Sequence, residues 1–212
     1  MIGVASKKDF LLVSIIGIIF GAFAIPILEN INPSGWRLTF VSAAILIGGF
    51  FIFANFAIFI AGLIGKKIPS LFQFAKYAAT GAMNSFTDLG LFNWLTMIFQ
   101  IFSGPLIIVI NTISFSIAVT NSYFWNNLWA FKREGGKLSI AEFGKFLGVT
   151  IGGVILNNLI VYVVTTVIGA PDEVTPQLWE NAAKLFGVPV AIMWNFFGYK
   201  YFVFKLPLAK NL

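Results

Sequence analysis

The chain has 212 residues, of which 58% are hydrophobic and only 10% charged, and its mean hydropathy is +0.90. A soluble domain of this length needs a polar surface that this composition does not provide. The absence of cysteine excludes disulfides and thiolate metal sites, and the absence of histidine removes the commonest metal ligand and general base. The composition therefore indicates an all-α, polytopic membrane protein. We expect no metal, no cofactor and no nucleic acid partner.

A transmembrane helix needs about 20 mostly apolar residues. Six segments meet this requirement, at residues 10–28, 39–64, 74–99, 105–130, 143–168 and 182–204. Gly and Pro in the intervening stretches, such as "SGP" and "GAPDEVTPQLWEN", are typical of helix ends and turns. The first segment is longer than the apolar core of a cleavable signal peptide and lacks a clear cleavage site, so we expect it to be retained.

Positive charge orients the six predicted spans. Twelve of the 14 basic residues fall at one end of the predicted bundle: Lys7, Lys8, Lys66, Lys67, Lys76, Lys132, Arg133, Lys137, Lys145, Lys200, Lys205 and Lys210. Arg37 and Lys184 fall at the other end. Because loops rich in Lys and Arg remain in the cytoplasm, we expect both termini on the cytoplasmic side of a cell membrane.

The last four predicted spans contain an internal repeat. "SLFQFAKY" from Ser70 and "SIAEFGKF" from Ser139 share a Ser-x-x-Gln/Glu pattern, which predicts a helix capping box, followed by Phe, Lys and an aromatic residue. The segments also end alike, in "LWAFK" and "YFVFK". Residues 70–132 and 139–205 are therefore predicted as two parallel two-helix repeats with a site where they meet. The alternative is that aromatic residues and Lys simply recur at membrane boundaries.

This repeat divides the chain into two predicted domains. Residues 1–68 form an added N-terminal transmembrane hairpin that lacks the repeated pattern, and residues 69–212 form a four-helix transmembrane domain.

The third predicted span carries polar residues well inside its apolar run, namely Asn84, Asp88 and Asn93. Asp88 follows Lys76 by about 18 Å along a helix, close to the middle of a hydrocarbon core about 30 Å thick. Asn84 lies one turn earlier on the same helical face. A carboxylate at that depth costs at least about 2.5 kcal/mol. We therefore expect Asp88 to face a polar interior, either protonated or hydrogen-bonded, because no basic residue is predicted at its depth.

Further Asn residues are predicted to lie in or near this layer. Asn157 occupies the position of the second repeat that corresponds to Asp88, and Asn121 and Asn195 reach a similar depth. The candidate binding residues are Asn84, Asp88, Asn121, Asn126, Asn157 and Asn195, because each carboxylate or carboxamide group can form two hydrogen bonds in a plane with a polar ligand. The alternative is that these side chains only hold helices together.

A second layer lies near the predicted cytoplasmic end and is rich in cations and aromatic residues. Basic pockets between helices on that side suit lipid phosphates. The candidate phosphate ligands are Lys76, Lys145, Lys200 and Arg133. The alternative is that these residues are ordinary interfacial anchors.

Four stretches together resemble the GtrA-like family: "FAKYAATGAMNSFTDLGLFNWL", "TNSYFWNNLWAFK", "FGKFLGVTIGGVILNNLIVYVV" and "WNFFGYKYFVFK". The shared motifs are Phe-x-Lys-Tyr, Gly-x-x-Asn-x-x-x-Asp and Asn-x-x-Trp-x-Phe, the last at Asn126, Trp129 and Phe131. The family's last motif usually has basic residues after the Asn, where this chain has Asn127 and Leu128.

The resemblance implies a role in cell-surface polysaccharide synthesis. Such proteins are thought to move a polyprenyl-phosphate-linked sugar between membrane leaflets, or to accompany a membrane glycosyltransferase. The expected partners are therefore a polyprenyl-phosphate-linked sugar, membrane lipid and a membrane glycosyltransferase. Because few spans are available to enclose a headgroup, a two-fold homodimer is also an expectation.

Three functions stay open from the sequence. The first is flipping of a polyprenyl-phosphate-linked monosaccharide. The second is a non-transporting scaffold of a glycosyltransferase, and the third is a proton-coupled cation exporter that uses Asp88. We do not expect an enzyme, because one acid without His, Cys or a second carboxylate is a poor catalytic set.

Overall fold

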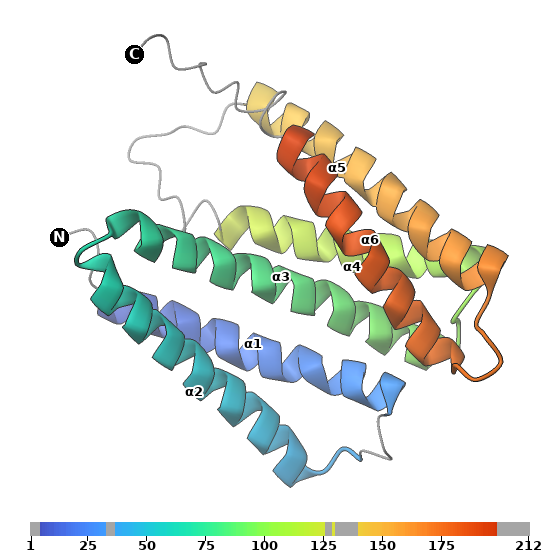
Figure 1. Ribbon diagram of the computed structural model, residues 1–212, viewed down its shortest axis with the longest axis horizontal. Coiled ribbons are helices and arrows are strands. Elements are labelled where there is room, and N and C mark those ends of the chain that lie inside the picture. The colour runs from blue at the N-terminus through green and yellow to red at the C-terminus, as the bar shows by residue number, and fades with distance from the viewer. Residues whose placement is uncertain (1–4, 33–36, 126–128, 130–139, 199–212) are drawn as a thin grey trace. The chain divides into compact units, whose positions relative to one another are not determined.

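A computed structural model gives the fold and describes residues 5–32, 37–125, 129 and 140–198. All regular structure within these residues is helical. The helices are α1 (Lys7–Ile31), α2 (Phe40–Gly65), α3 (Pro69–Phe99), α4 (Pro105–Trp125), α5 (Ile140–Tyr162), the π-helical segment η3 (Val163–Ile168) and α6 (Pro176–Gly198). Figure 1 shows them in chain order. The all-helical fold class is therefore confirmed.

The helix starts differ from the predicted starts in an informative way at two places. α3 begins at Pro69, with Ile68 at the N-cap and no side-chain cap, so the predicted capping box at Ser70 is wrong. Proline suits the first helical position because its missing N–H would have no partner there. α6 begins at Pro176, ahead of the predicted residue 182, and Leu178 N donates to Thr175 Oγ1 at 3.3 Å.

Four helical segments are long and apolar enough to cross a membrane, among the residues that the structure describes. These are Lys7–Ile31, Phe40–Gly65, Pro105–Ser122 and Leu147–Ile168. α3 and α6 are of similar length but carry more polar side chains. The protein is thus a helical membrane protein, and the count of six spans, the repeat and the side on which the termini lie stay predictions.

The chain divides into two compact units. The first contains residues Met1–Gln100 and Ile113–Arg133, and the second contains Ile101–Thr112 and Glu134–Leu212. α4 is one helix whose first part belongs to the second unit. These units are defined by packing, whereas the predicted domain boundary at residue 68 rests on a sequence repeat. The units therefore do not test that boundary, which stays a prediction.

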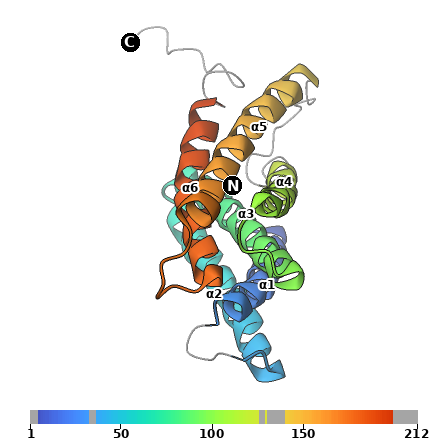
Figure 2. The ribbon, with the colours of Figure 1, turned by 90° about the vertical axis from the view of Figure 1, so that its right-hand side faces the viewer.

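In the first unit, α1 lies beside both α2 and α3, as Figures 1 and 2 show. Gly17 and Gly21, one turn apart on α1, face the α2 backbone. A Cβ atom on Gly21 would lie 2.4 Å from Ile47 Cα, and one on Gly17 would lie 2.8 Å from Phe50 O. Small residues at this spacing let membrane helices approach closely, which is the main source of packing energy in lipid.

The contact between α1 and α3 also depends on a glycine. A Cβ atom on Gly90 of α3 would lie 2.5 Å from Phe23 Cβ. Phe20, Phe50 and Phe86, one from each of α1, α2 and α3, form an aromatic group with ring centroids 4.3–5.8 Å apart. The N-terminal hairpin is therefore an integral part of the first unit.

The free face of α2 is strongly apolar. Ile45, Phe53 and Phe56 are 68%, 67% and 61% exposed. In water such a surface would be unfavourable, but it suits contact with lipid chains.

In the second unit, α6 packs along α5 through glycines of both helices. A Cβ atom on Gly152 would lie 2.6 Å from Trp194 Nε1, and one on Gly198 would lie 2.3 Å from Val149 Cγ1. Trp194 Nε1 donates to Val149 O at 2.9 Å, and Trp179 Nε1 donates to Val164 O at 2.8 Å. The indole donors thus fix the pairing of the two helices at both ends.

Candidate functional site

A buried polar layer joins α3 to α4 in the first unit, and we call it the α3–α4 layer. Its members are Asn84, Asp88, Ser114 and Asn121. Ser114 Oγ donates to Asp88 Oδ1 at 2.7 Å, and Asn121 Nδ2 donates to Asn84 Oδ1 at 3.1 Å. Asp88 is 5% exposed and Asn84 9% exposed, so the acid is buried and bonded to α4.

Helical spacing explains why these four side chains meet. Asn84 and Asp88 are four residues apart, and Ser114 and Asn121 are seven apart, so each pair lies on one face of its helix. The sequence prediction had placed Asn84, Asp88 and Asn121 in one layer. Ser114 was not among the predicted residues, because a lone Ser in an apolar helix commonly bonds its own backbone.

Two polar atoms beside the layer have no hydrogen-bond partner within the described part of the chain. They are Asn84 Nδ2 and Thr87 Oγ1, both buried. Buried polar atoms are paired in the large majority of cases, and each exception calls for a physical explanation. A donor and a hydroxyl in this position are free to bind water or a ligand hydroxyl.

A shallow hollow runs along α4 next to the layer. It has a volume of about 430 Å³ and is lined by Ser116, Ile117, Thr120, Asn121 and Phe124. Asn121 belongs to both the hollow and the α3–α4 layer. A small polar group in the hollow would therefore reach the amide that contacts Asn84.

A separate polar contact joins α1 to α3. Asn30 Nδ2 donates to Asn93 Oδ1 at 2.9 Å and to Thr96 Oγ1 at 3.3 Å. Asn93 also donates to Leu89 O at 2.8 Å. This arrangement is typical of helix adhesion in lipid, so Asn93 belongs to the docking of α1 and not to the α3–α4 layer.

The second unit has its own Asn cluster. Asn111 Nδ2 donates to the Oδ1 atoms of Asn157 and Asn158, at 2.8 Å in each case. Asn158 Nδ2 donates in turn to Thr112 Oγ1 at 2.7 Å. Asn157, the predicted counterpart of Asp88, is therefore fully buried and contacts α4, as Asp88 does, but through an amide partner.

Gly187→Ala is expected to disrupt this Asn cluster. The new Cβ would lie 2.5 Å from Asn157 Nδ2 and 3.3 Å from Asn157 Cγ. Because Asn157 is held by Asn111, its displacement should cost about 1–3 kcal/mol of unfolding free energy, measured by chemical unfolding in detergent. Gly148→Ala on α5, where nothing lies within 4 Å, serves as control and should be neutral or stabilising. Equal losses in the two variants would contradict the prediction.

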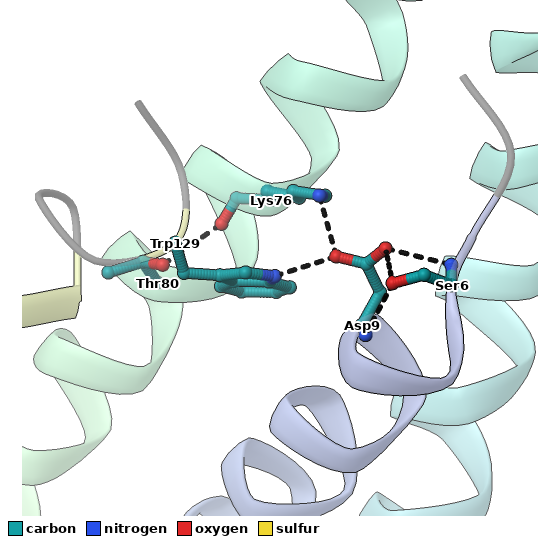
Figure 3. Close-up of polar contacts among 5 residues, drawn as sticks. All are labelled: Ser6, Asp9, Lys76, Thr80 and Trp129. Carbon is teal, nitrogen blue, oxygen red and sulfur yellow. Dashed lines mark hydrogen bonds and ion pairs between the residues drawn. The ribbon is translucent and has the colours of Figure 1, made fainter. Parts of the chain in front are cut away.

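Lys76, a predicted phosphate ligand, is held by an acid of the N-terminal hairpin. Lys76 Nζ lies 2.6 Å from Asp9 Oδ1, and Trp129 Nε1 donates to the same oxygen at 2.8 Å, as Figure 3 shows. Asp9 is 5% exposed. The ammonium also lies 4.6 Å from the ring centroid of Phe72 and 5.7 Å from that of Trp129.

Among the remaining predicted site residues, the structure describes the side chain of Lys145 alone. Lys145 is exposed on α5. Asn126, Arg133 and Lys200 lie outside the described residues, and the side chain of Asn195 is not described. The described residues hold no group of three or more His, Cys, Asp or Glu side chains suited to a metal ion.

The part of the chain that carries these clusters matches a known protein family. The family profile described as GtrA/DPMS, transmembrane domain, matches residues 76–204, which is more than half of the chain. The chain belongs to the GtrA/DPMS transmembrane-domain family. The match to this profile confirms the predicted family resemblance. Comparison with curated proteins and with solved structures gave no match.

Membership of the GtrA/DPMS family indicates a membrane protein of polyprenyl-phosphate sugar biosynthesis or translocation. Proteins of this family are in general translocases or accessory membrane proteins rather than catalytic enzymes. The match begins at Lys76 and takes in all of α4, α5 and α6, so the α3–α4 layer and the Asn cluster both lie inside it. Asp9, on α1, lies outside the part that matches the GtrA/DPMS profile.

Sequence reasoning missed Asp9 as the partner of Lys76. The signal present was local: Ser6-x-x-Asp9 forms a capping box at the start of α1, with Asp9 N donating to Ser6 Oγ at 3.2 Å. A capping box predicts where a helix begins, but it does not predict which other helix the acid contacts.

Sequence reasoning also did not predict that Lys184 is buried. The predicted span began at residue 182, but α6 begins at Pro176, so Lys184 lies about two turns inside the helix. Lys184 and Glu180, one turn earlier on the same face, are both 0% exposed. The absence of a basic residue at the depth of Asp88 stays a prediction, but α6 does contain a buried Lys.

Proposed function

We propose that this protein moves a polyprenyl-phosphate-linked monosaccharide across the membrane. The observation that carries the proposal is the α3–α4 layer, a buried carboxylate beside amide and hydroxyl groups within a family of polyprenyl-phosphate sugar proteins. A buried ionisable group inside a membrane helix is costly and is retained where it serves a polar pathway.

The chemistry of the layer suits a sugar. Each hydroxyl of a monosaccharide can donate one hydrogen bond and accept others. Asp88 offers acceptor oxygens, Asn84 offers its unpartnered Nδ2, and Thr87 offers a hydroxyl that can do both. Sugar hydroxyls would thus exchange water for these groups as the headgroup crosses, while the polyprenyl chain stays in lipid.

The lipid phosphate is proposed to bind at the end of the helices where Lys76 lies. The other proposed phosphate ligands are Lys145, Lys200 and Arg133. Lys binds phosphate as a compact point charge, and a cytoplasmic position for this end follows from the excess of basic residues there. Asn126, Asn157 and Asn195 complete the proposed set of sugar ligands.

Flipping in proteoliposomes tests the proposal. A fluorescent or radiolabelled polyprenyl-phosphate hexose is incorporated on one side, and its accessibility on the other side is followed over time. Asp88→Ala should reduce the rate at least about tenfold, since a hydrogen bond to a charged group contributes about 1.5–3 kcal/mol. Asn55→Ala is the control, because Asn55 also joins two helices, through Ser14, but lies outside the layer. Equal flipping rates for wild type and Asp88→Ala would overturn the assignment.

An accessory role is the second candidate, and one observation favours it. The hydrogen bonds Ser114–Asp88 and Asn121–Asn84 join α4 to α3, as simple helix adhesion requires. In that case, Asp88→Ala should leave sugar transfer by a co-reconstituted membrane glycosyltransferase unchanged. Substitutions on the exposed apolar face of α2, such as Phe56→Lys, should instead reduce that transfer.

A further inference from the structure

Asp9 uses its two carboxylate oxygens for different purposes. Oδ2 accepts from Ser6 N at 2.8 Å and from Ser6 Oγ at 2.7 Å, which completes the capping box of α1. Oδ1 instead contacts Lys76 of α3 and Trp129, at 2.6 and 2.8 Å. Figure 3 shows the two sets of contacts on opposite sides of the carboxylate. Helix capping needs only the first set, so the second set calls for a separate explanation.

Lys76 and Trp129 together form a receptor for an anionic oxygen. An ammonium and an indole N–H converge on one atom, and both can only donate. The ammonium lies over the rings of Phe72 and Trp129, with ring centroids 4.6 and 5.7 Å away. In the present structure the anionic oxygen is Asp9 Oδ1.

A phosphate oxygen has the same requirements as this carboxylate oxygen. Both are negatively charged acceptors, and charge-assisted bonds from an ammonium to either are short and strong. The single N–H of Trp129 cannot serve Asp9 and a phosphate oxygen at once, so a phosphate that binds where Lys76 and Trp129 converge must displace Asp9 Oδ1. Because Asp9 is part of the same chain, it competes at every ligand concentration.

We propose that Asp9 is a built-in competitor that occupies the phosphate site of Lys76 and Trp129 until a lipid phosphate displaces it. The proposal rests on the proposed function, which assigns Lys76 to the substrate phosphate. The N-terminal hairpin then sets how tightly the site binds, because an occluded site lowers the apparent affinity by the fraction of molecules in which it is free.

Binding of farnesyl phosphate to the full chain in phosphatidylcholine nanodiscs tests the proposal. Asp9→Asn keeps the size of the side chain and an oxygen for Ser6 but removes the charge. We expect it to bind at least about fivefold tighter than wild type. The double variant Asp9→Asn/Lys76→Gln should lose this gain. Asp172→Asn, which makes the same charge change at an exposed position, should stay within twofold of wild type.

Two results would overturn the proposal. The first is an Asp9→Asn variant that binds farnesyl phosphate no tighter than wild type, although its thermal unfolding curve shows that it is folded. The second is a tryptophan emission of wild type that stays constant at saturation with farnesyl phosphate, because it would mean that Asp9 is never displaced. We expect instead that farnesyl phosphate changes this emission and that the change vanishes in Trp129→Phe.

Inorganic phosphate distinguishes the source of the ligand. We expect Asp9→Asn to bind it at least about tenfold more weakly than farnesyl phosphate, because the apolar chain adds binding energy in lipid. Equal affinities would overturn the lipid assignment. These measurements involve neither a sugar nor transport, so they can fail while Asp88-dependent flipping succeeds, and the reverse also holds.

Discussion

Gly21→Leu is expected to unfold the N-terminal hairpin. The first side-chain carbon would lie 2.4 Å from Ile47 Cα and 2.9 Å from Ile47 N, which are backbone atoms that no rotamer change can move aside. The helices would have to separate, and in lipid they would lose the close packing that holds them together. We expect the free energy of unfolding to fall by about 3 kcal/mol or more. Denaturant titration in detergent micelles measures this loss.

Gly48→Leu is the matched control for this prediction. Gly48 lies on α2 in the same hairpin, and nothing stands within 4 Å of the position of its missing Cβ. Leucine also favours a helix over glycine by nearly 1 kcal/mol, so the control should be neutral or slightly stabilising. If both variants lose the same stability, the close approach of α1 and α2 is not what holds the hairpin.

Lys184→Met is expected to destabilise the second unit strongly. Lys184 and Glu180 are 0% exposed and lie one turn apart on α6, within reach of each other for side chains at this spacing. Removing one of two buried charges reduces the compensation of the other, which costs about 3–5 kcal/mol where the two form a pair. The double variant Lys184→Met/Glu180→Gln should recover a large part of the loss, because neither charge remains. Thermal unfolding in detergent of wild type, Lys184→Met, Glu180→Gln and the double variant gives the coupling energy between the two residues.

Lys145→Met serves as control for the loss of a positive charge. Lys145 is exposed on α5, so its replacement should change the melting temperature little. Strictly additive effects of Lys184→Met and Glu180→Gln would show that the two buried charges are not coupled.

The sequence predicted helices and their positions well because those properties are local. The run from Phe10 to Leu28 and the run that contains Asp88 are recognisable from apolar length alone. Helix starts were less predictable, since Pro69 and Pro176 begin their helices earlier than the apolar runs do. That shift decides whether Lys184 lies at a surface or inside the bundle.

The family of this protein follows from sequence motifs, such as Gly-x-x-Asn-x-x-x-Asp at Asp88, without any coordinates. The partners of the polar residues do not follow in this way. Asn30 donates a hydrogen bond to Asn93, 63 residues later in the chain. Asp9 accepts one from Trp129, 120 residues later. Such pairs depend on how each helix is rotated about its axis, which close contacts at Gly21 and Gly90 set. Periodicity shows that a helix has a polar face, but packing decides which neighbour that face meets.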